Sequence, residues 1–196
     1  LERRGGTLRL GTHVEQILLE SGKVAGVRVR QGEVLRAPIV ISNATLWDTY
    51  THLLDPAALP DLDRRRALAT PAVDSFMHLH LGIRATDLPP LTGHHVVVHD
   101  CDRDLTAPGN TCMISIPSVW DRQLAPAGHH VIHTYTLEPF ADWQRNAEYG
   151  DRKQHRAAPL WKALERIISD VKNRVVLELI GTPLTHARYL RRSQGT

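Results

Sequence analysis

The chain has 196 residues, with 24 Lys and Arg against 21 Asp and Glu and a formal net charge of +3. Hydrophobic residues make up 42% and charged residues 23%, a composition that is typical of a folded globular chain and excludes disordered and fibrous ones. So small a charge excess does not indicate a nucleic-acid partner. No run approaches the roughly 18 to 20 apolar residues that a membrane span requires.

The first 42 residues predict a small antiparallel sheet. Apolar residues alternate with polar ones at Leu8 and Leu10 and over 14–19, 24–29 and 34–35, which is the period of a strand. The connections 20–23 and 30–33 each carry a glycine where a hairpin requires positive φ. The apolar run 39–41 predicts a further short strand that is buried on both faces.

Helical spacing of apolar residues then predicts a helix over 44–54, after the capping residues Ser42 and Asn43. The rest of the chain predicts a mixed β and α region, with a boundary between two structural units near Thr45. Its expected helices cover 62–69, 159–171 and 185–192, and its expected strands cover 74–83, 95–99, 112–117, 131–137 and 175–180. From the residues alone, the fold class is α+β.

The usual nucleotide-binding loops are absent from these 196 residues. No two of the 13 glycines are two positions apart, so the phosphate-binding pattern GxGxxG cannot occur. The chain also contains neither the Gly-Lys-Ser/Thr sequence of a P-loop nor the GxSxG turn of a nucleophilic serine.

Histidines form three groups along the chain. His78 and His80 alternate on one strand face, and the other groups are 94, 95 and 99, and 129, 130 and 133. Imidazoles bind zinc, copper or iron, but no HExxH motif or histidine–carboxylate triad is present. We therefore assign no metal ligand, and keep a non-catalytic histidine-rich metal-binding module as the alternative from another functional class.

Several strings resemble one family. Gly5-Gly6, Val14, Ile17, 22–24 and Gly26-Val27 resemble the adenine-side strand pair of flavoproteins of the phytoene desaturase and amine oxidase type. The string 40–49, VISNATLWDT, resembles the strand-to-helix return of the carotenoid (prolycopene) isomerase branch, and so do the strings within 79–82, 115–121, 124–130 and 181–190. The resemblance covers nearly the whole chain.

This resemblance implies an α/β fold, namely part of a glutathione-reductase-type FAD-binding domain with an inserted mixed β/α substrate domain. Residues 1–45 would then belong to the FAD-binding domain, 46–176 to the substrate domain, and 177–196 to a return segment toward the FAD domain. Family members carry a Rossmann strand with its glycine fingerprint before the matching region and a second flavin-contacting segment after it. We therefore expect an internal segment that binds FAD weakly by itself.

The resemblance also implies an activity. Members of this branch convert poly-cis lycopene to the all-trans form with reduced FAD, which transiently donates an electron or hydride to the polyene. The implied cofactor-binding residues are Val14, through its backbone beside the adenine, and Ser42 and Asn43. No catalytic side chain is assigned, and the oligomeric state is open. A carotenoid desaturase or a retinol-saturating relative is the alternative within the same fold.

A carotenoid substrate implies a peripheral position at a plastid or cyanobacterial membrane. The candidate contacts are Leu53-Leu54 with Leu59, and the segment 88–91. Loop packing explains these apolar residues equally well.

Overall fold

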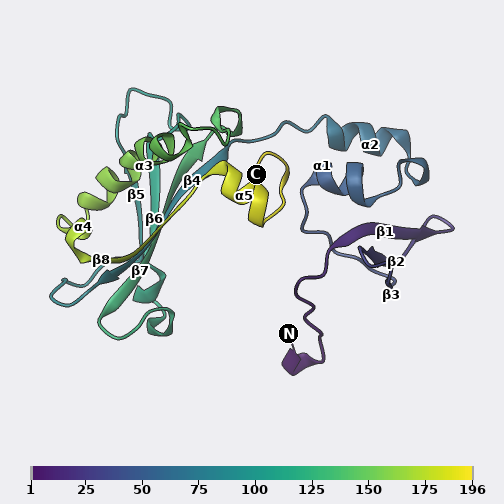
Figure 1. The fold of residues 1–196 in the computed structure, drawn as a ribbon, viewed down its shortest axis with the longest axis horizontal. Helices are drawn as coiled ribbons and strands as arrows, with labels where there is room; N and C mark the ends of the chain where they lie inside the picture. Colours follow the sequence, from purple (N-terminus) through teal and green to yellow (C-terminus); the bar gives the residue numbers. More distant parts are fainter. Residues whose placement is uncertain (1, 196) are drawn as a thin grey trace. The chain divides into compact units, whose positions relative to one another are not determined.

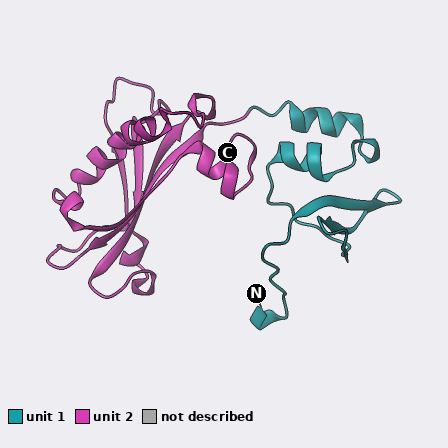
Figure 2. Ribbon diagram, in the orientation of Figure 1, with its two compact units in different colours: residues 1–71 teal, residues 72–196 magenta. Residues whose placement is uncertain are grey.

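The computed structural model describes residues 2–195 and divides into two compact units, residues 1–71 and 72–196 (Figure 2). Helices accompany antiparallel sheets in both units (Figure 1), so the mixed α/β fold class is confirmed. The units divide after Pro71, whereas the assignment of 1–45, 46–176 and 177–196 to family domains stays a prediction.

Unit 1 is built on a three-stranded antiparallel sheet in the order β1–β2–β3. The strands are β1 (Val14–Glu20), β2 (Lys23–Val29) and β3 (Val34–Arg36). Ser21 and Gly22 both have positive φ, 49° and 75°, as the tightest hairpin turns require. Gly32, with φ 85°, turns the chain from β2 into β3. Both predicted hairpins are confirmed.

The predicted helix over 44–54 forms as two joined pieces, α1 (Leu46–Asp48) and a π-helical turn, η2 (Thr49–Leu53). Its N-cap is Thr45, whose hydroxyl accepts a hydrogen bond from the backbone N–H of Asp48, and not Ser42 or Asn43. The other helical elements of unit 1 are η1 (Glu2–Arg4), η3 (Pro56–Ala58) and α2 (Asp61–Leu68). The predicted helix over 62–69 is therefore confirmed.

Two predicted strands of the first 42 residues do not form. Leu8 and Leu10 lie outside any strand, and so does the run 39–41, where Ile39 is 76% and Ile41 91% exposed. A strand gains stability by pairing with neighbours and burying its side chains. Among the described residues, β1, β2 and β3 pair only with one another. The prediction of a strand buried on both faces was wrong for this chain.

Unit 2 contains a five-stranded antiparallel sheet in the order β5–β6–β7–β4–β8. Its strands are β4 (Ser75–Arg84), β5 (His94–Val98), β6 (Thr111–Ser115), β7 (His129–Glu138) and β8 (Val175–Gly181). All five agree with the predicted ranges to within a few residues. Figure 1 shows the helices α3 (Tyr149–Glu165) and α4 (Val171–Arg174) along one side of this sheet.

The core of unit 2 lies between the sheet and α3. Alternate residues of β4, namely Met77, Leu79, Leu81 and Ile83, are fully or almost fully buried, and they cluster with Leu160 and Leu164 of α3. Short elements complete the unit: η4 (Pro117–Val119), η5 (Arg122–Leu124), η6 (Phe140–Asp142), α5 (Pro183–Tyr189) and η7 (Ser193–Gly195). None of the helices within residues 2–195 is long and apolar enough to cross a membrane.

The helix predicted to start at Pro159 begins ten residues earlier, at Tyr149. The predicted start rests on the apolar stripe that follows Pro159 in the sequence. In the structure Pro159 lies inside α3, where Ala157 and Leu160 on either side of it are buried in the core. The free energy gained by packing this face outweighs the cost of the backbone hydrogen bond that proline cannot donate.

Candidate functional site

The face of the five-stranded sheet opposite α3 carries an ordered set of aromatic and apolar side chains. Because side chains alternate along a strand, Phe76, His78 and His80 of β4 point away from the buried residues 77, 79 and 81. The strand registers align these positions with those of the neighbouring strands in two rows. One row runs Leu179–His80–His133–Ser115–His94, and the other Gly181–His78–Tyr135–Met113–Val96.

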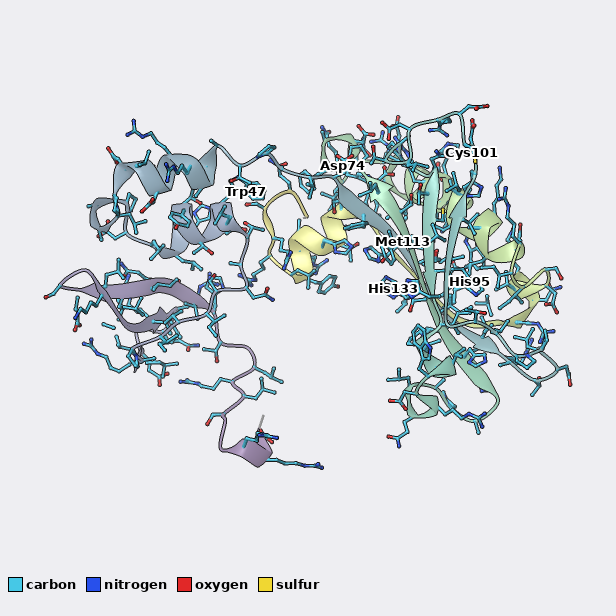
Figure 3. All side chains as sticks on the ribbon, turned by 180° about the vertical axis from the view of Figure 1, so that it is seen from behind. Trp47, Asp74, His95, Cys101, Met113 and His133 are labelled. Atoms are coloured by element: carbon cyan, nitrogen blue, oxygen red, sulfur yellow. The ribbon has the colours of Figure 1, made fainter. Side chains whose placement is uncertain are left out.

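We call this surface the open face. Val96, Met113 and Leu179 on it are exposed, and Figure 3 labels Met113 and His133 on the neighbouring strands β6 and β7. The two rows contain neither a carboxylate nor a lysine or arginine. The open face is therefore an apolar and aromatic surface of a kind that suits a hydrophobic ligand.

Four imidazoles gather at the centre of the open face, and we call them the histidine cluster: His78, His80, His133 and His186. Nδ1 of His78 lies 2.6 Å from Nε2 of His133, and the ring of His80 stacks on that of His133 with centroids 4.4 Å apart. His186, from α5, brings its ring centroid within 4.4 Å of that of His78. Tyr135 stacks beside them, 5.0 Å from His133.

The cluster holds its imidazoles in the neutral form. Burial, together with the neighbouring His186, His133 and His80, lowers the pKa of His78 to about 3. Burial, with His80 and His186, lowers the pKa of His133 to about 4. Burial also lowers the pKa of His80 and of His186. At neutral pH these rings have lone pairs available to accept a proton, a hydrogen bond or a cation.

The other predicted histidine groups do not assemble in the same way. His95 lies beside the carbonyl of Thr92, and His129 beside that of Ala127. Nε2 of His99 lies 3.0 Å from the carbonyl of Pro159. His95 and His129 thus contact nearby loop carbonyls, whereas His99 contacts a carbonyl inside α3. Each contact is structural.

Sequence reasoning identified His78 and His80 as a pair and placed His133 in a different group. It missed His186 as a partner because 53 residues separate it from His133 and only the fold brings α5 to β4. For His133, the sequence indicated only that it lies in a strand, because residues 131–137 alternate. The antiparallel register that makes it the partner of His80 was not predicted.

The predicted cofactor-binding residues lie in unit 1. Val14 is the first residue of β1 and pairs with Val29 of β2. Ser42 and Asn43 are exposed and lie between β3 and α1, where the Ser42 hydroxyl is 2.8 Å from that of Thr49. Their roles toward a flavin stay predictions.

A cleft of about 630 Å³ in unit 2 is lined by residues 88–91 and by His129 and His130, among others. Leu88 and Leu91 also pack against the core, which agrees with loop packing for this segment. Ser118 accepts a hydrogen bond from the backbone N–H of Val131 and lies 2.8 Å from Nδ1 of His130. The Ser118 hydroxyl, which is buried, therefore orders the start of β7.

Comparison with known proteins identifies the family. The sequence pattern of the flavin containing amine oxidoreductases matches residues 1–177. The chain belongs to this family. A flavin is accordingly the cofactor that the family implies.

Two relatives within this family are similar to the chain over almost its whole length. A carrot (Daucus carota) protein named "Prolycopene isomerase, chloroplastic" is 36% identical over 197 residues, covering 98% of this chain and 32% of the carrot protein. A Cereibacter sphaeroides protein named "Phytoene desaturase (neurosporene-forming)" is 30% identical over 213 residues, covering 97% of this chain and 39% of that protein. This member of the amine oxidoreductase family thus spans about a third of the length of the relatives that it matches.

A solved structure agrees on the fold. The crystal structure of an oxidoreductase from Methanosarcina mazei superposes with a TM-score of 0.56 at 22% identity, covering 91% of this chain and 39% of that one. At this identity the likeness concerns the fold alone.

The described residues do not by themselves fit a complete FAD. The pyrophosphate is commonly held by a glycine-rich loop at the N-terminus of a helix. In the described part of unit 1, α2 is the longest helix, and its first turn carries Asp61 and Asp63, whose negative charges disfavour a phosphate group. The described residues of unit 1 therefore lack the usual site for the pyrophosphate, and the contact of Val14 with the adenine stays a prediction.

Proposed function

We propose that this chain is part of a FAD-dependent carotenoid isomerase that converts poly-cis lycopene to all-trans lycopene with the flavin reduced. One observation carries the proposal: the 36% identity to the carrot prolycopene isomerase extends over 98% of the chain. The activity belongs to the complete protein, because this chain corresponds to 32% of that relative.

The open face supports a hydrophobic substrate. A polyene has no group that forms hydrogen bonds, so its recognition depends on apolar contact area and exclusion of water. Leu179, Tyr135 and Met113 offer such contacts on neighbouring strands. In this proposal the residues of the open face bind and orient the polyene, and none of them is assigned a covalent role.

We also propose the domain assignment that the family resemblance implies. Residues 1–45 form part of the FAD-binding domain, with the backbone of Val14 beside the adenine and Ser42 and Asn43 toward the cofactor. Residues 46–176 form the substrate domain, and 177–196 return toward the FAD domain. The proposed location is peripheral, at a plastid or cyanobacterial membrane, and the carrot relative is named chloroplastic.

A carotenoid desaturase, or a retinol-saturating enzyme, is the second candidate. The 30% identity to the Cereibacter phytoene desaturase favours a desaturase over flavoenzymes that act on substrates other than carotenoids. Desaturation removes hydrogen atoms from the polyene and saturation adds them, whereas isomerisation leaves the mass unchanged. The family match favours any of these flavoenzymes over a module that only binds metal.

The deciding experiment expresses the natural gene in bacteria that accumulate poly-cis lycopene and analyses the pigments by chromatography and mass spectrometry. All-trans lycopene at unchanged mass supports the isomerase. A product lighter by pairs of hydrogens supports the desaturase, and one heavier by pairs the saturating enzyme. An unchanged poly-cis profile, with soluble flavin-loaded protein present, contradicts the proposal.

Two substitutions test the open face in the same assay. Leu179 of β8 and Leu105, in the loop between β5 and β6, are similarly exposed, at 57% and 58%, but only Leu179 lies opposite His80. Leu179→Glu places a charge where the polyene would bind, and we expect a loss of at least about tenfold in product. Leu105→Glu, outside the two rows of the open face, serves as the matched control. Equal effects of the two substitutions would contradict the assigned surface.

A further inference from the structure

The histidine cluster has the composition of a metal site. Three imidazoles, those of His78, His80 and His133, each place one ring nitrogen within 4.8 Å of the other two. Zinc binds imidazole nitrogen at about 2.0 Å in tetrahedral geometry, which separates two ligand nitrogens by about 3.3 Å. The three nitrogens thus require displacements of no more than about 1.5 Å to share one ion.

We propose that His78, His80 and His133 bind a divalent transition-metal cation of the zinc type on the open face, with His186 positioned beside them. The inference does not depend on the proposed isomerase activity. It departs from the expectation, drawn from the sequence, that the chain has no metal ligand.

The positions of the ligands on the backbone support the site. His80 and His133 are direct cross-strand partners, and His78 lies two residues from His80 on the same face. A pair of adjacent strands in fixed register holds three imidazoles on one small area, as a rigid metal site requires. His186 comes from α5, a separate element, so it can supply a fourth imidazole or leave that position to water.

An unsatisfied polar atom also points to a ligand. Among the described residues, Nε2 of His78 is buried and has no hydrogen-bond partner. Its other nitrogen is already paired with His133, so a change of tautomer does not satisfy both atoms. A buried polar atom without a partner costs free energy and calls for a water or an ion as the explanation.

The chemistry of the cluster matches a borderline divalent ion. Imidazole suits zinc, copper and nickel, whereas calcium and magnesium prefer oxygen ligands. Three histidines with one open position form a recognised zinc ligand set. The rings of His80 and His133 are parallel, with planes 1° apart, so binding requires one of them to turn. His80 is exposed and has room to do so.

The test is calorimetric titration of Zn²⁺ into the untagged full chain, repeated with Co²⁺ while its visible absorption is recorded. We expect one equivalent per chain and the absorption of nitrogen-coordinated Co²⁺. His80→Ala is the main variant, because His80 is exposed and its removal leaves the core intact. We expect it to weaken Zn²⁺ binding at least tenfold.

His155→Ala is the matched control, since His155 is exposed on α3 and lies outside the cluster. We expect its Zn²⁺ affinity to equal that of the wild type. Circular dichroism checks that each variant is folded, and Zn²⁺ should raise the Tm of the wild type and of His155→Ala but not that of His80→Ala. Absence of stoichiometric binding, or equal weakening by both substitutions, would overturn the proposal. Because no flavin or carotenoid is present, this result is independent of the isomerase assay.

Discussion

His80 of β4 and His133 of β7 are direct cross-strand partners, and their imidazole rings stack with centroids 4.4 Å apart and planes 1° from parallel. Next to His80 in the sequence, Leu79 and Leu81 point to the other side of the sheet and are almost fully buried. One strand therefore contributes to two structures, the core of unit 2 on one side and the histidine cluster on the other. The strict alternation of β4 makes this division possible.

Adjacent residues of β4 should respond very differently to substitution. Leu79→Ala removes a fully buried side chain from the core, and we expect a loss of about 2–5 kcal/mol in the free energy of unfolding. His80→Ala truncates an exposed side chain, and we expect a change of no more than about 1 kcal/mol. Urea unfolding, monitored by hydrogen exchange in the strands of unit 2, measures both changes in the free energy of unfolding. Similar losses would show that the open face is packed in the native state.

Gly26 is the position of unit 1 that tolerates a side chain least. It has φ 142°, and a Cβ atom there would lie 2.1 Å from the carbonyl oxygen of Leu35 on β3. Gly26→Ala must therefore separate β2 from β3, and we expect the three-stranded sheet to lose protection from hydrogen exchange. Gly32→Ala is the control, since Gly32 also has positive φ but open space around it. We expect it to cost only about 1 kcal/mol.

The local signals in the sequence predicted local structure well. Gly22 identified the first hairpin because a tight turn requires positive φ, which glycine adopts readily. The alternation over 74–83 identified the strand β4, and the structure shows that its core lies on one side only. Both features depend on neighbours in the sequence, and no distant part of the chain is needed to establish them.

Features that depend on distant partners were not predictable. The apolar run at Ile39 and Ile41 has the composition of a buried strand, but a strand forms only where another pairs with it. Pro159 lies within α3 because the face around it packs on the sheet. The histidine cluster unites residues 78, 80, 133 and 186 through strand register and the placement of α5, neither of which a single sequence encodes in a readable pattern.

Gly93 allows a close approach of Trp120. A Cβ atom on Gly93 would lie 2.4 Å from the indole ring, and Trp120 is 64% exposed, so the ring is free to move outward. We expect Gly93→Ala to shift the indole further into water with a stability loss below about 1 kcal/mol. The fluorescence of a variant that retains only Trp120 should move to longer wavelength. An unchanged spectrum together with a large stability loss would contradict this.

Glu138 should make the stability of unit 2 depend on pH. Its carboxylate is buried, accepts a hydrogen bond from Nε1 of Trp143 and lies 3.3 Å from Arg156. Burial raises its pKa above the ordinary 4.5, although Arg156 and Trp143 oppose the shift and Asp142 and Asp74 support it.

A carboxyl group with a raised pKa in the folded state stabilises the fold below its unfolded pKa, and this contribution is lost as the pH rises through the folded pKa. The unfolding free energy of the wild type should thus fall, relative to that of Glu138→Gln, as the pH rises from about 4. Denaturant unfolding of both proteins across this range gives the comparison. A difference that is constant with pH would mean that Glu138 does not titrate differently on folding. Asp63→Asn, at an exposed carboxylate in unit 1, controls for the general effect of removing a negative charge.

The chain by itself should bind FAD weakly. It has no glycine pair two residues apart to approach the pyrophosphate, and Asp61 and Asp63 occupy the first turn of the longest described helix of unit 1. We expect titration of FAD into residues 1–196 to give no saturable quenching of flavin fluorescence at micromolar concentration. Adenosine, which lacks the phosphates, should bind no more weakly than FAD, since the contact predicted for the backbone of Val14 is to the adenine. Tight binding of one FAD per chain would show that the cofactor site is formed by residues other than those assigned here.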